Sequence, residues 1–102
     1  MTGGPEFRLV CKAKGLPMPE AEYRFHPVRK WRMDWAWPEQ RVALEVDGGV
    51  WVRGKHGRGS GIVKDHEKQN HAAALGWRIL RVQPRDLLAA STFDLIRQAL
   101  EA

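Results

Sequence analysis

Three carboxylates on two neighbouring segments are the residues of this sequence best suited to do chemistry. Asp34 stands eleven residues before Glu45, and Asp47 follows Glu45 inside the apolar run 42–49. Side chains alternate along a strand, so Glu45 and Asp47 share one face, where like charges repel and burial of either is costly. A divalent cation removes both penalties, and Mg²⁺ binds a few carboxylates together with water and phosphate oxygens. The sequence therefore predicts a metal site with Asp34 and Glu45 as principal ligands and Asp47 assisting.

Basic residues lie on both sides of these acids in the sequence. The net charge is +5 and the pI is about 9.9. One cluster precedes Asp34 and another follows Asp47: Arg24, Arg29, Lys30 and Arg32, then Arg53, Lys55, His56, Arg58, Lys64 and Lys68. Clustered cations are typical of nucleic-acid binding proteins, because neutralised phosphates release their counterions. The alternatives are a merely solvated basic surface, and salt bridges from the acids to Arg24, Arg32 or Arg41.

Chain length and cysteine content limit the class of protein. The 102 residues are enough for a single domain, residues 1–102, with one modest core. Cys11 is the only cysteine, which excludes an intrachain disulfide and a multi-cysteine zinc site. The sequence has no apolar run of membrane-spanning length and no signal-peptide pattern. We therefore expect no membrane partner and a cytoplasmic, intracellular location.

Hydrophobic periodicity and turn residues predict the element order αβββαβα, an α/β fold with a small mixed sheet flanked by helices. The expected helices cover residues 5–14, 64–75 and a last segment capped by Ser91, and the expected strands cover 22–26, 30–37, 41–47 and 77–82. Short turns between the first three strands favour an antiparallel meander. Residues 48–61 are expected to form a glycine-rich, cationic loop.

Apolar side chains at regular spacing predict the core. The expected buried residues are Phe7, Val10 and Cys11 in the first helix, Trp31, Trp35 and Trp37 on one strand face, and Phe93, Leu95, Ile96 and Leu100 in the last helix. Trp51 is different, because it lies among the cations of the 48–61 loop. An aromatic ring in that setting can stack on an unpaired base, or it can anchor the loop or a dimer interface.

Several of these segments together carry a resemblance to a known superfamily. The relevant runs are Arg32-Met33-Asp34, Ala43-Leu44-Glu45-Val46-Asp47-Gly48-Gly49, Asp65 with Lys68, and Gly76-Trp77-Arg78-Ile79-Leu80-Arg81. In this order they resemble the PD-(D/E)XK nucleases, and most of all small phage-type endonucleases related to very-short-patch-repair enzymes and Holliday junction resolvases. The resemblance implies a restriction-endonuclease-like core that holds Mg²⁺, with Mn²⁺ as an alternative, and cleaves phosphodiester bonds. It also implies that a glutamate from the N-terminal region reaches the ion, with Glu22 preferred over Glu6 and a capping or surface role as the alternative for either.

One departure from the superfamily pattern leaves a role open. Asp47 occupies the position of the lysine that holds or polarises the attacking water in the superfamily. Lys68 is the first candidate to replace that lysine, Lys64 the second and His56 the third, and plain phosphate binding or solvation is the alternative for each.

The resulting functional expectation is a Mg²⁺-dependent DNA endonuclease. The expected catalytic residues are Asp34, Glu45, Asp47 and Lys68, the expected metal ligands are Asp34, Glu45, Asp47 and Glu22, and the expected DNA contacts are Arg29, Lys30, Arg32, Trp51, Arg53, Lys55, His56, Arg58 and Lys64. The resemblance to junction resolvases implies cleavage of branched or junction DNA by a homodimer in recombination or repair, in a protein that could be phage-encoded. A domain this small covers little DNA, which agrees with structure-specific cleavage. The alternatives are a single-strand nicking repair endonuclease and a catalytically inactive DNA-binding module.

Overall fold

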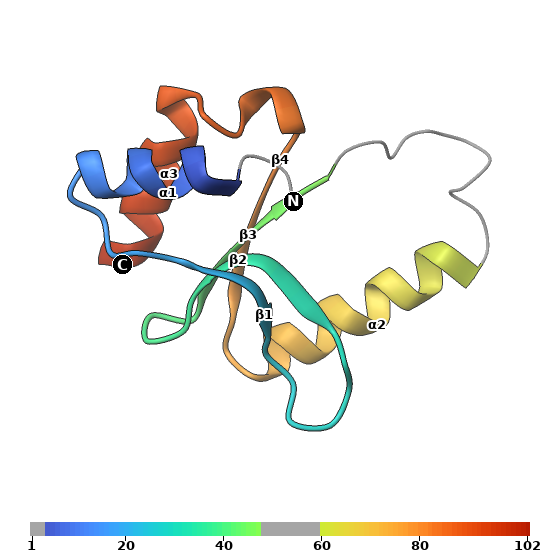
Figure 1. The fold of residues 1–102 in the computed structure, drawn as a ribbon. Coiled ribbons are helices and arrows are strands. Elements are labelled where there is room, and N and C mark those ends of the chain that lie inside the picture. The colour runs from blue at the N-terminus through green and yellow to red at the C-terminus, as the bar shows by residue number, and fades with distance from the viewer. Residues whose placement is uncertain (1–3, 48–59) are drawn as a thin grey trace.

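Three helices and a four-stranded mixed sheet make up the part of the chain that the structure describes. The computed structural model describes residues 4–47 and 60–102. In chain order the elements are α1 (Gly4–Ala13), β1 (Glu20–Arg24), β2 (Arg32–Trp37), β3 (Val42–Val46), α2 (Ser60–Ala74), β4 (Arg78–Val82), a short 3₁₀ helix η2 (Pro84–Asp86) and α3 (Ala90–Glu101) (Figure 1). The α/β class and the αβββαβα order predicted from the sequence are confirmed.

The sheet has the order β1-β2-β3-β4. The first three strands form the predicted antiparallel meander, and β4 then pairs parallel to β3. A parallel partner needs a crossover connection, and α2 supplies it. In the parallel pair Glu45 lies directly beside Arg81, so this topology brings a charge to β3 from a distant part of the sequence.

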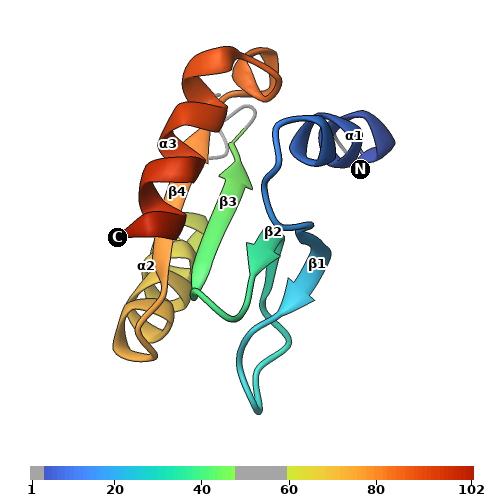
Figure 2. The same cartoon turned by 90° about the vertical axis from the view of Figure 1, so that its left-hand side faces the viewer.

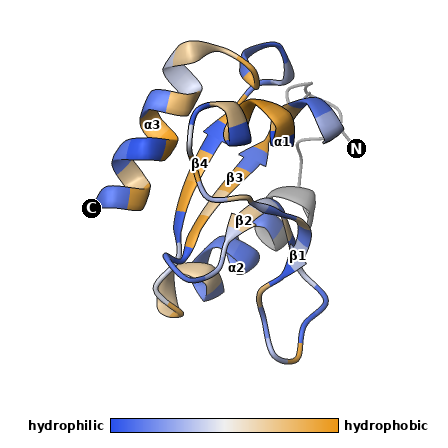
Figure 3. Ribbon diagram, turned by 60° about the vertical axis from the view of Figure 1, so that its left-hand side comes forward, coloured by the Kyte–Doolittle hydropathy of each residue, from blue (hydrophilic) through white to orange (hydrophobic). Residues whose placement is uncertain are grey.

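Helices cover both faces of the sheet. One face packs against α1 and α3, whose Phe7, Cys11, Phe93 and Ile96 join Trp35 and other strand residues in the first core cluster. The other face packs against α2, where Ala72 joins Ala43 and Met33 in a second cluster. Figure 2 shows the sheet between these helices, and Figure 3 shows hydrophobic residues concentrated on β3 and β4 and on the parts of α1 and α3 beside them. The acids of β3 therefore have a helix on their own side of the sheet.

A local rotation in the β1–β2 pair changes the face that its side chains reach. Ala21 pairs with Trp35, and both contribute to the first cluster, whereas Tyr23 pairs with Met33, and both contribute to the second. Residues two apart normally share a face. The strands must turn between these two pairs, where Glu22 has a φ of 50°. Such a φ is uncommon for a residue with a side chain.

Several details of the sequence prediction are wrong. Trp31 precedes β2, is only partly buried and packs with the second cluster instead of with Trp35 and Trp37. Leu95 is 47% exposed on α3, although its neighbours Phe93 and Ile96 are buried.

The predicted cap of the last helix is also wrong. α3 begins at Ala90 after Ala89, and no side chain caps that end. The hydroxyl of Thr92, in the first turn of α3, instead donates a hydrogen bond to the carbonyl of Asp86, the last residue of η2, at 2.7 Å. This hydrogen bond links η2 to α3.

Element boundaries differ from the predicted ones by a few residues. β1 begins two residues before the predicted strand 22–26 and ends at Arg24, β2 begins at Arg32 instead of residue 30, and α2 begins at Ser60 instead of residue 64. Within the described residues no helix has both the length and the apolar character needed to span a membrane.

Candidate active site

Strands β2 and β3 separate at the acidic residues. Their pairing runs from Trp35 with Leu44 to Trp37 with Val42, although β2 begins earlier and β3 continues to Val46. In the opened region the Asp34 carboxylate accepts a hydrogen bond from the backbone N–H of Val46 at 2.7 Å. A side chain thus takes the place of a ladder hydrogen bond, and it fixes the Asp34 carboxylate next to the end of β3.

Glu45 is a buried carboxylate paired with a lysine. It is 8% exposed, and the Lys68 Nζ lies 3.3 Å from each of its carboxylate oxygens. Burial raises the pKa of Glu45, the positive charge of Lys68 lowers it, and the negative charge of Asp34 raises it. The net pKa shift is upward, because the effect of burial is the largest. The contributions of Asp34 and Lys68 mean that both lie close enough to Glu45 to influence its ionisation.

The position of Lys68 follows from the fold. Glu45 projects from β3 on the face that α2 covers, and Lys68 lies in the middle of that helix. Its side chain is only 17% exposed. Lys68 was the first of the three residues predicted to replace the motif lysine, and its ammonium group lies beside Glu45. Lys64 is also in α2, but its side chain is outside the described part of the structure, as is all of His56.

Arg81 holds the third acid of the predicted group. Its Nη1 lies 2.7 Å from the Asp47 carboxylate, and its Nη2 lies 3.7 Å from the carboxylate of Asp65 in α2. Burial works against the charge of this guanidinium, but the hydrogen bond and charge of Asp47, with further contributions from Asp65 and Glu45, outweigh it and raise the pKa of Arg81. Asp47 is therefore directed toward β4.

The structure brings together only some of the residues that the sequence predicts as metal ligands. Among the described residues, no group of three or more His, Cys, Asp or Glu side chains is placed to hold one ion. Glu22 is exposed and lies in the rotated part of β1. It is opposite Asp34 in the register, between the pairs Ala21–Trp35 and Tyr23–Met33. Glu6 lies in α1, which packs on the opposite face of the sheet from α2. The remaining candidate is the pair Asp34 and Glu45.

A pair of carboxylates fits Mg²⁺ better than it fits most other metals. Mg²⁺ demands octahedral oxygen coordination, keeps several waters, and is usually held by one or two carboxylates plus substrate phosphate. Asp34 keeps one carboxylate oxygen that does not accept from Val46, and Glu45 has two oxygens whose described partner is Lys68. The donor set is thus compatible with Mg²⁺ or Mn²⁺ when a phosphate completes the shell.

The predicted DNA contacts fall into two groups. Arg29 and Lys30 are exposed between β1 and β2, and Arg32 is exposed at the start of β2. Arg29 Nη1 also bonds to the Glu67 carboxylate of α2 at 3.1 Å. Trp51, Arg53, Lys55, His56 and Arg58 lie outside the described residues, and Lys64 lies in α2 with its side chain outside the described part of the structure.

Comparison with known proteins gives relatives without an assigned activity. The chain is 33% identical over 84 residues to each of two Mycobacterium tuberculosis proteins, the uncharacterized proteins MT2308 (strain CDC 1551 / Oshkosh) and Rv2248 (strain ATCC 25618 / H37Rv). The match covers 80% of this chain but only 30% of each relative, so the chain spans less than a third of their length. No family model matches the chain. No solved structure matches it either.

Arg81 and Asp65 are the members of this site that the sequence reasoning did not identify as site residues. Both had been quoted only as part of the resemblance. The available signal was parity on a parallel strand: once β4 is placed beside β3 in register, Arg81 and Glu45 share a face. Neither the register nor the choice of neighbouring strand can be read from the sequence of β4 alone.

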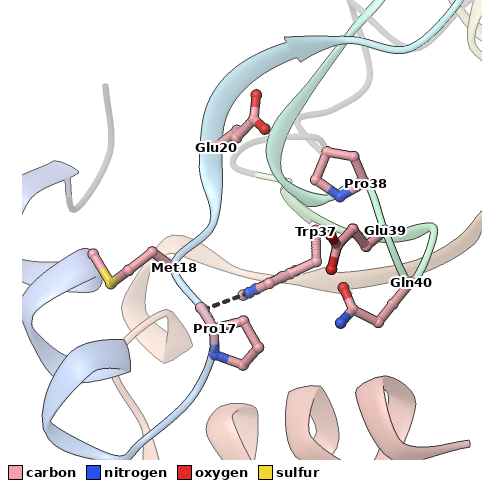
Figure 4. Close-up of a pocket in the computed structure, with 7 residues that line it drawn as sticks. All are labelled: Pro17, Met18, Glu20, Trp37, Pro38, Glu39 and Gln40. Carbon is pink, nitrogen blue, oxygen red and sulfur yellow. Dashed lines mark hydrogen bonds between the residues drawn. The ribbon is translucent and has the colours of Figure 1, made fainter.

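A pocket of about 220 Å³ lies away from these charges. It is lined by Pro17, Met18, Glu20, Trp37, Pro38, Glu39 and Gln40 (Figure 4). The indole Nε1 of Trp37 donates to the carbonyl of Pro17 at 2.7 Å across it. This pocket is at the turn between β2 and β3, the opposite end of β3 from Glu45, and it contains none of the predicted site residues.

Proposed function

We propose that this chain is a Mg²⁺-dependent DNA endonuclease that hydrolyses phosphodiester bonds. The single observation that carries the proposal is the arrangement of Asp34, Glu45 and Lys68: two adjacent carboxylates, one of them buried, with an ammonium group 3.3 Å from the buried one. This is the acid, acid and lysine combination of the superfamily that the sequence resembles. Here the lysine comes from α2 and not from the strand.

Each residue has a role that its surroundings support. Asp34 and Glu45 would hold Mg²⁺, which when bound lowers the pKa of a coordinated water and neutralises charge developing on the phosphate. The Val46 N–H fixes the orientation of Asp34. Lys68, whose ammonium group lies beside Glu45, would donate a hydrogen bond to the attacking water or to a phosphate oxygen. Asp47, held by Arg81, would assist at the edge of the site, and Glu22 is close enough in register to Asp34 to contribute from β1.

The substrate is proposed to be branched DNA, cut by a homodimer. The support is indirect: the domain is small, and the fully described cations among the predicted DNA contacts, Arg29, Lys30 and Arg32, are exposed at the β1–β2 connection and the start of β2. Residues 48–59 contain further cations, and we propose that they contact phosphates as well. The relatives are much longer than this chain, so the activity and partners of a whole protein of that kind are also proposals.

A second candidate is a DNA-binding module without catalytic activity. The observation that favours it is that Lys68 and Arg81 already neutralise Glu45 and Asp47, so a metal is not required to relieve their repulsion. The two candidates differ in one property, because only an enzyme has need of the divalent ion.

The decisive experiment is incubation of labelled four-way junctions, flaps and linear duplex with the protein, with and without Mg²⁺. We expect metal-dependent cleavage, greatest for the four-way junction, and its loss in the Asp34→Asn and Glu45→Gln variants. Asp94→Asn is the matched control, because Asp94 is an exposed acid on α3, on the other side of the sheet.

Each outcome has a distinct meaning. Absence of metal-dependent cleavage on all three substrates, with DNA binding retained, would favour the inactive module. A junction cut no better than duplex would overturn the resolvase-like specificity alone, and cleavage of only one strand would favour the nicking repair enzyme.

A further inference from the structure

An aromatic and histidine cluster lies beside the candidate active site, on the surface formed by α2 and the β1–β2 connection. The rings of His26, Trp31 and His71 contact one another pairwise, with centroid separations of 5.1–5.3 Å. The guanidinium of Arg29 lies over the Trp31 ring, 4.1 Å from its centroid. Phe25 lies nearly parallel to Trp31, at an interplanar angle of 13°. We call these five residues the ring cluster.

The ring cluster reaches the protein surface. His71 is exposed, Trp31 and His26 are partly exposed, and the Arg29 side chain is 45% exposed. Because the Arg29 guanidinium covers one face of the Trp31 ring, the planar surface left in contact with water is the guanidinium itself, the His71 ring and part of the indole. Phe25 by contrast is buried, and it supports the cluster from beneath.

Arg29 is held over the indole by a second contact. Its Nη1 bonds to the Glu67 carboxylate at 3.1 Å, and Glu67 is one helical turn before His71 on α2. The loop itself is fixed by His26, whose Nδ1 accepts from the backbone N–H groups of Val28 and Arg29 at 3.1 and 2.9 Å. The planar groups are therefore positioned by the protein before any ligand arrives.

The charge around the ring cluster identifies the kind of ligand. Arg29, Lys30 and Arg32 flank Trp31 in the sequence and are exposed. Planar rings surrounded by cations are the combination that binds single-stranded nucleic acid, because bases stack on the rings while the cations contact phosphates. A metal is a poorer fit, because the Nδ1 of His26 is already occupied as a hydrogen-bond acceptor.

The position of the cluster relates it to the acids. Lys68 and His71 are three residues apart on α2, and Trp31 precedes Asp34 by three residues, which is about 10 Å of extended chain. Successive nucleotides rise by about 3.4 Å along a stacked strand. A base on the ring cluster would thus be only a few nucleotides from a phosphate at Asp34 and Glu45.

We infer that the ring cluster stacks an unpaired nucleobase of the DNA, with Trp31, Arg29 and His71 as the stacking groups. This inference rests on the DNA-binding part of the proposed function but not on cleavage. It specifies the substrate further, as DNA with an unpaired base close to the cleaved phosphate.

The test measures the binding of fluorescently labelled oligothymidylate and of a matched duplex by fluorescence anisotropy, at one salt concentration and without divalent ions. Trp31→Ala, and independently His71→Ala, should weaken oligothymidylate binding about tenfold while changing duplex binding little. Arg29→Lys keeps the charge but removes the planar guanidinium, and it should weaken the same interaction. His71 is exposed on a helix, so His71→Ala remains informative if Trp31→Ala does not fold. Leu95→Ala, on α3, is the control.

A second pair of probes isolates the base. A duplex with a single-nucleotide bulge should bind the wild-type protein more tightly than the same duplex with an abasic bulge, and Trp31→Ala should abolish that difference. Variants that bind oligothymidylate as tightly as the wild type, or that lose affinity for duplex in equal proportion, would overturn the inference. Stacking-dependent binding without cleavage of any substrate would support it while overturning the nuclease, and absence of all DNA binding would overturn both.

Discussion

Glu45 and Lys68 form a charge pair that is largely withdrawn from water, and removing one partner should be costly. Lys68→Met keeps the length of the side chain but leaves Glu45 buried beside the negative Asp34. We expect a loss of about 3 kcal/mol in the free energy of unfolding, measured by urea denaturation. The double variant Glu45→Gln, Lys68→Met should recover much of that loss, because neither buried group is then charged.

The control for this pair is Lys12→Met, which removes an exposed lysine from α1. Its effect should stay within a few tenths of a kcal/mol. If the effects of Glu45→Gln and Lys68→Met simply add, the pair is not coupled in solution. In the nuclease assay Lys68→Met should lower the cleavage rate by about a hundredfold while leaving DNA affinity unchanged.

Asp34 accepts a hydrogen bond from Val46 and is also a proposed metal ligand, and two substitutions distinguish these roles. Asp34→Asn retains an oxygen that can accept from the Val46 N–H, whereas Asp34→Ala leaves that N–H without its partner. We expect Asp34→Ala to be less stable than Asp34→Asn by about 1 kcal/mol in urea denaturation. Both should abolish any rise in melting temperature that Mg²⁺ gives the wild-type protein. Equal stability of the two variants would mean that the Val46 hydrogen bond contributes nothing.

At the scale of elements, the β1–β2 connection depends on a histidine in its neutral form. Nδ1 of His26 accepts two backbone hydrogen bonds, which a proton on that nitrogen would remove. Desolvation lowers the pKa of His26, and the facing groups His71 and Arg29 lower it further. A histidine whose pKa is lowered in the folded state binds fewer protons than it does in the unfolded state. Its contribution to stability is therefore complete above the ordinary pKa of 6.5 and is lost as the pH falls below that value.

His26→Asn tests this dependence, because the asparagine side-chain oxygen can accept the same backbone N–H groups without titrating. We expect the stability difference between the variant and the wild type to shift in favour of the variant as the pH falls below 6.5. Urea denaturation at a series of pH values measures it, and His66→Asn, at an exposed position of α2, is the control. A difference that is independent of pH would show that His26 does not titrate in this range.

The order of elements could be predicted from the sequence because it depends on local periodicity and turn residues. The neighbours of each element could not, because they depend on register. Trp31 and Met33 have the parity of Trp35, yet both pack on the α2 side, since the strands rotate at Glu22. Asp34 and Glu45 could be proposed as site residues from their chemistry, and the structure places the Asp34 carboxylate beside the end of β3 that carries Glu45. The partnership of Arg81 with Asp47 needed the parallel placement of β4, which no local pattern encodes.

At the scale of the whole molecule, the sheet separates two hydrophobic cores that differ in composition and in their distance from the candidate site. The core beneath α1 and α3 holds the largest buried side chains, including Trp35, Trp37 and Phe7. The core beneath α2 combines three alanines with Phe25, Met33 and Trp77, and both the acids and the ring cluster lie on its side. Substitutions of the acids or of the ring cluster therefore remove no side chain from the core beneath α1 and α3.

Cys11 reports on whether that larger core opens as a unit. It is fully buried between α1 and the sheet, and burial raises the pKa of its thiol from 9.0 to about 11. Thiolate is the reactive form, so the higher pKa alone lowers reactivity at neutral pH about a hundredfold. Reaction also requires access, which only unfolding of α1 or of the whole domain supplies. We expect labelling of native protein with a thiol reagent to proceed at the rate set by the global unfolding equilibrium.

The matched control is Leu9→Cys in a Cys11→Ala background, because Leu9 lies on the same helix but is 65% exposed. That thiol should react at the rate of unfolded protein, while Cys11 reacts at least about a thousandfold more slowly. Addition of urea should accelerate Cys11 labelling in parallel with the unfolding equilibrium measured by tryptophan fluorescence. Labelling of Cys11 that is fast and insensitive to urea would mean that α1 detaches on its own. Because Phe7 packs against Trp35 and Phe93 at centroid distances of 4.7 and 5.4 Å, we expect α1 instead to remain attached until the sheet itself unfolds.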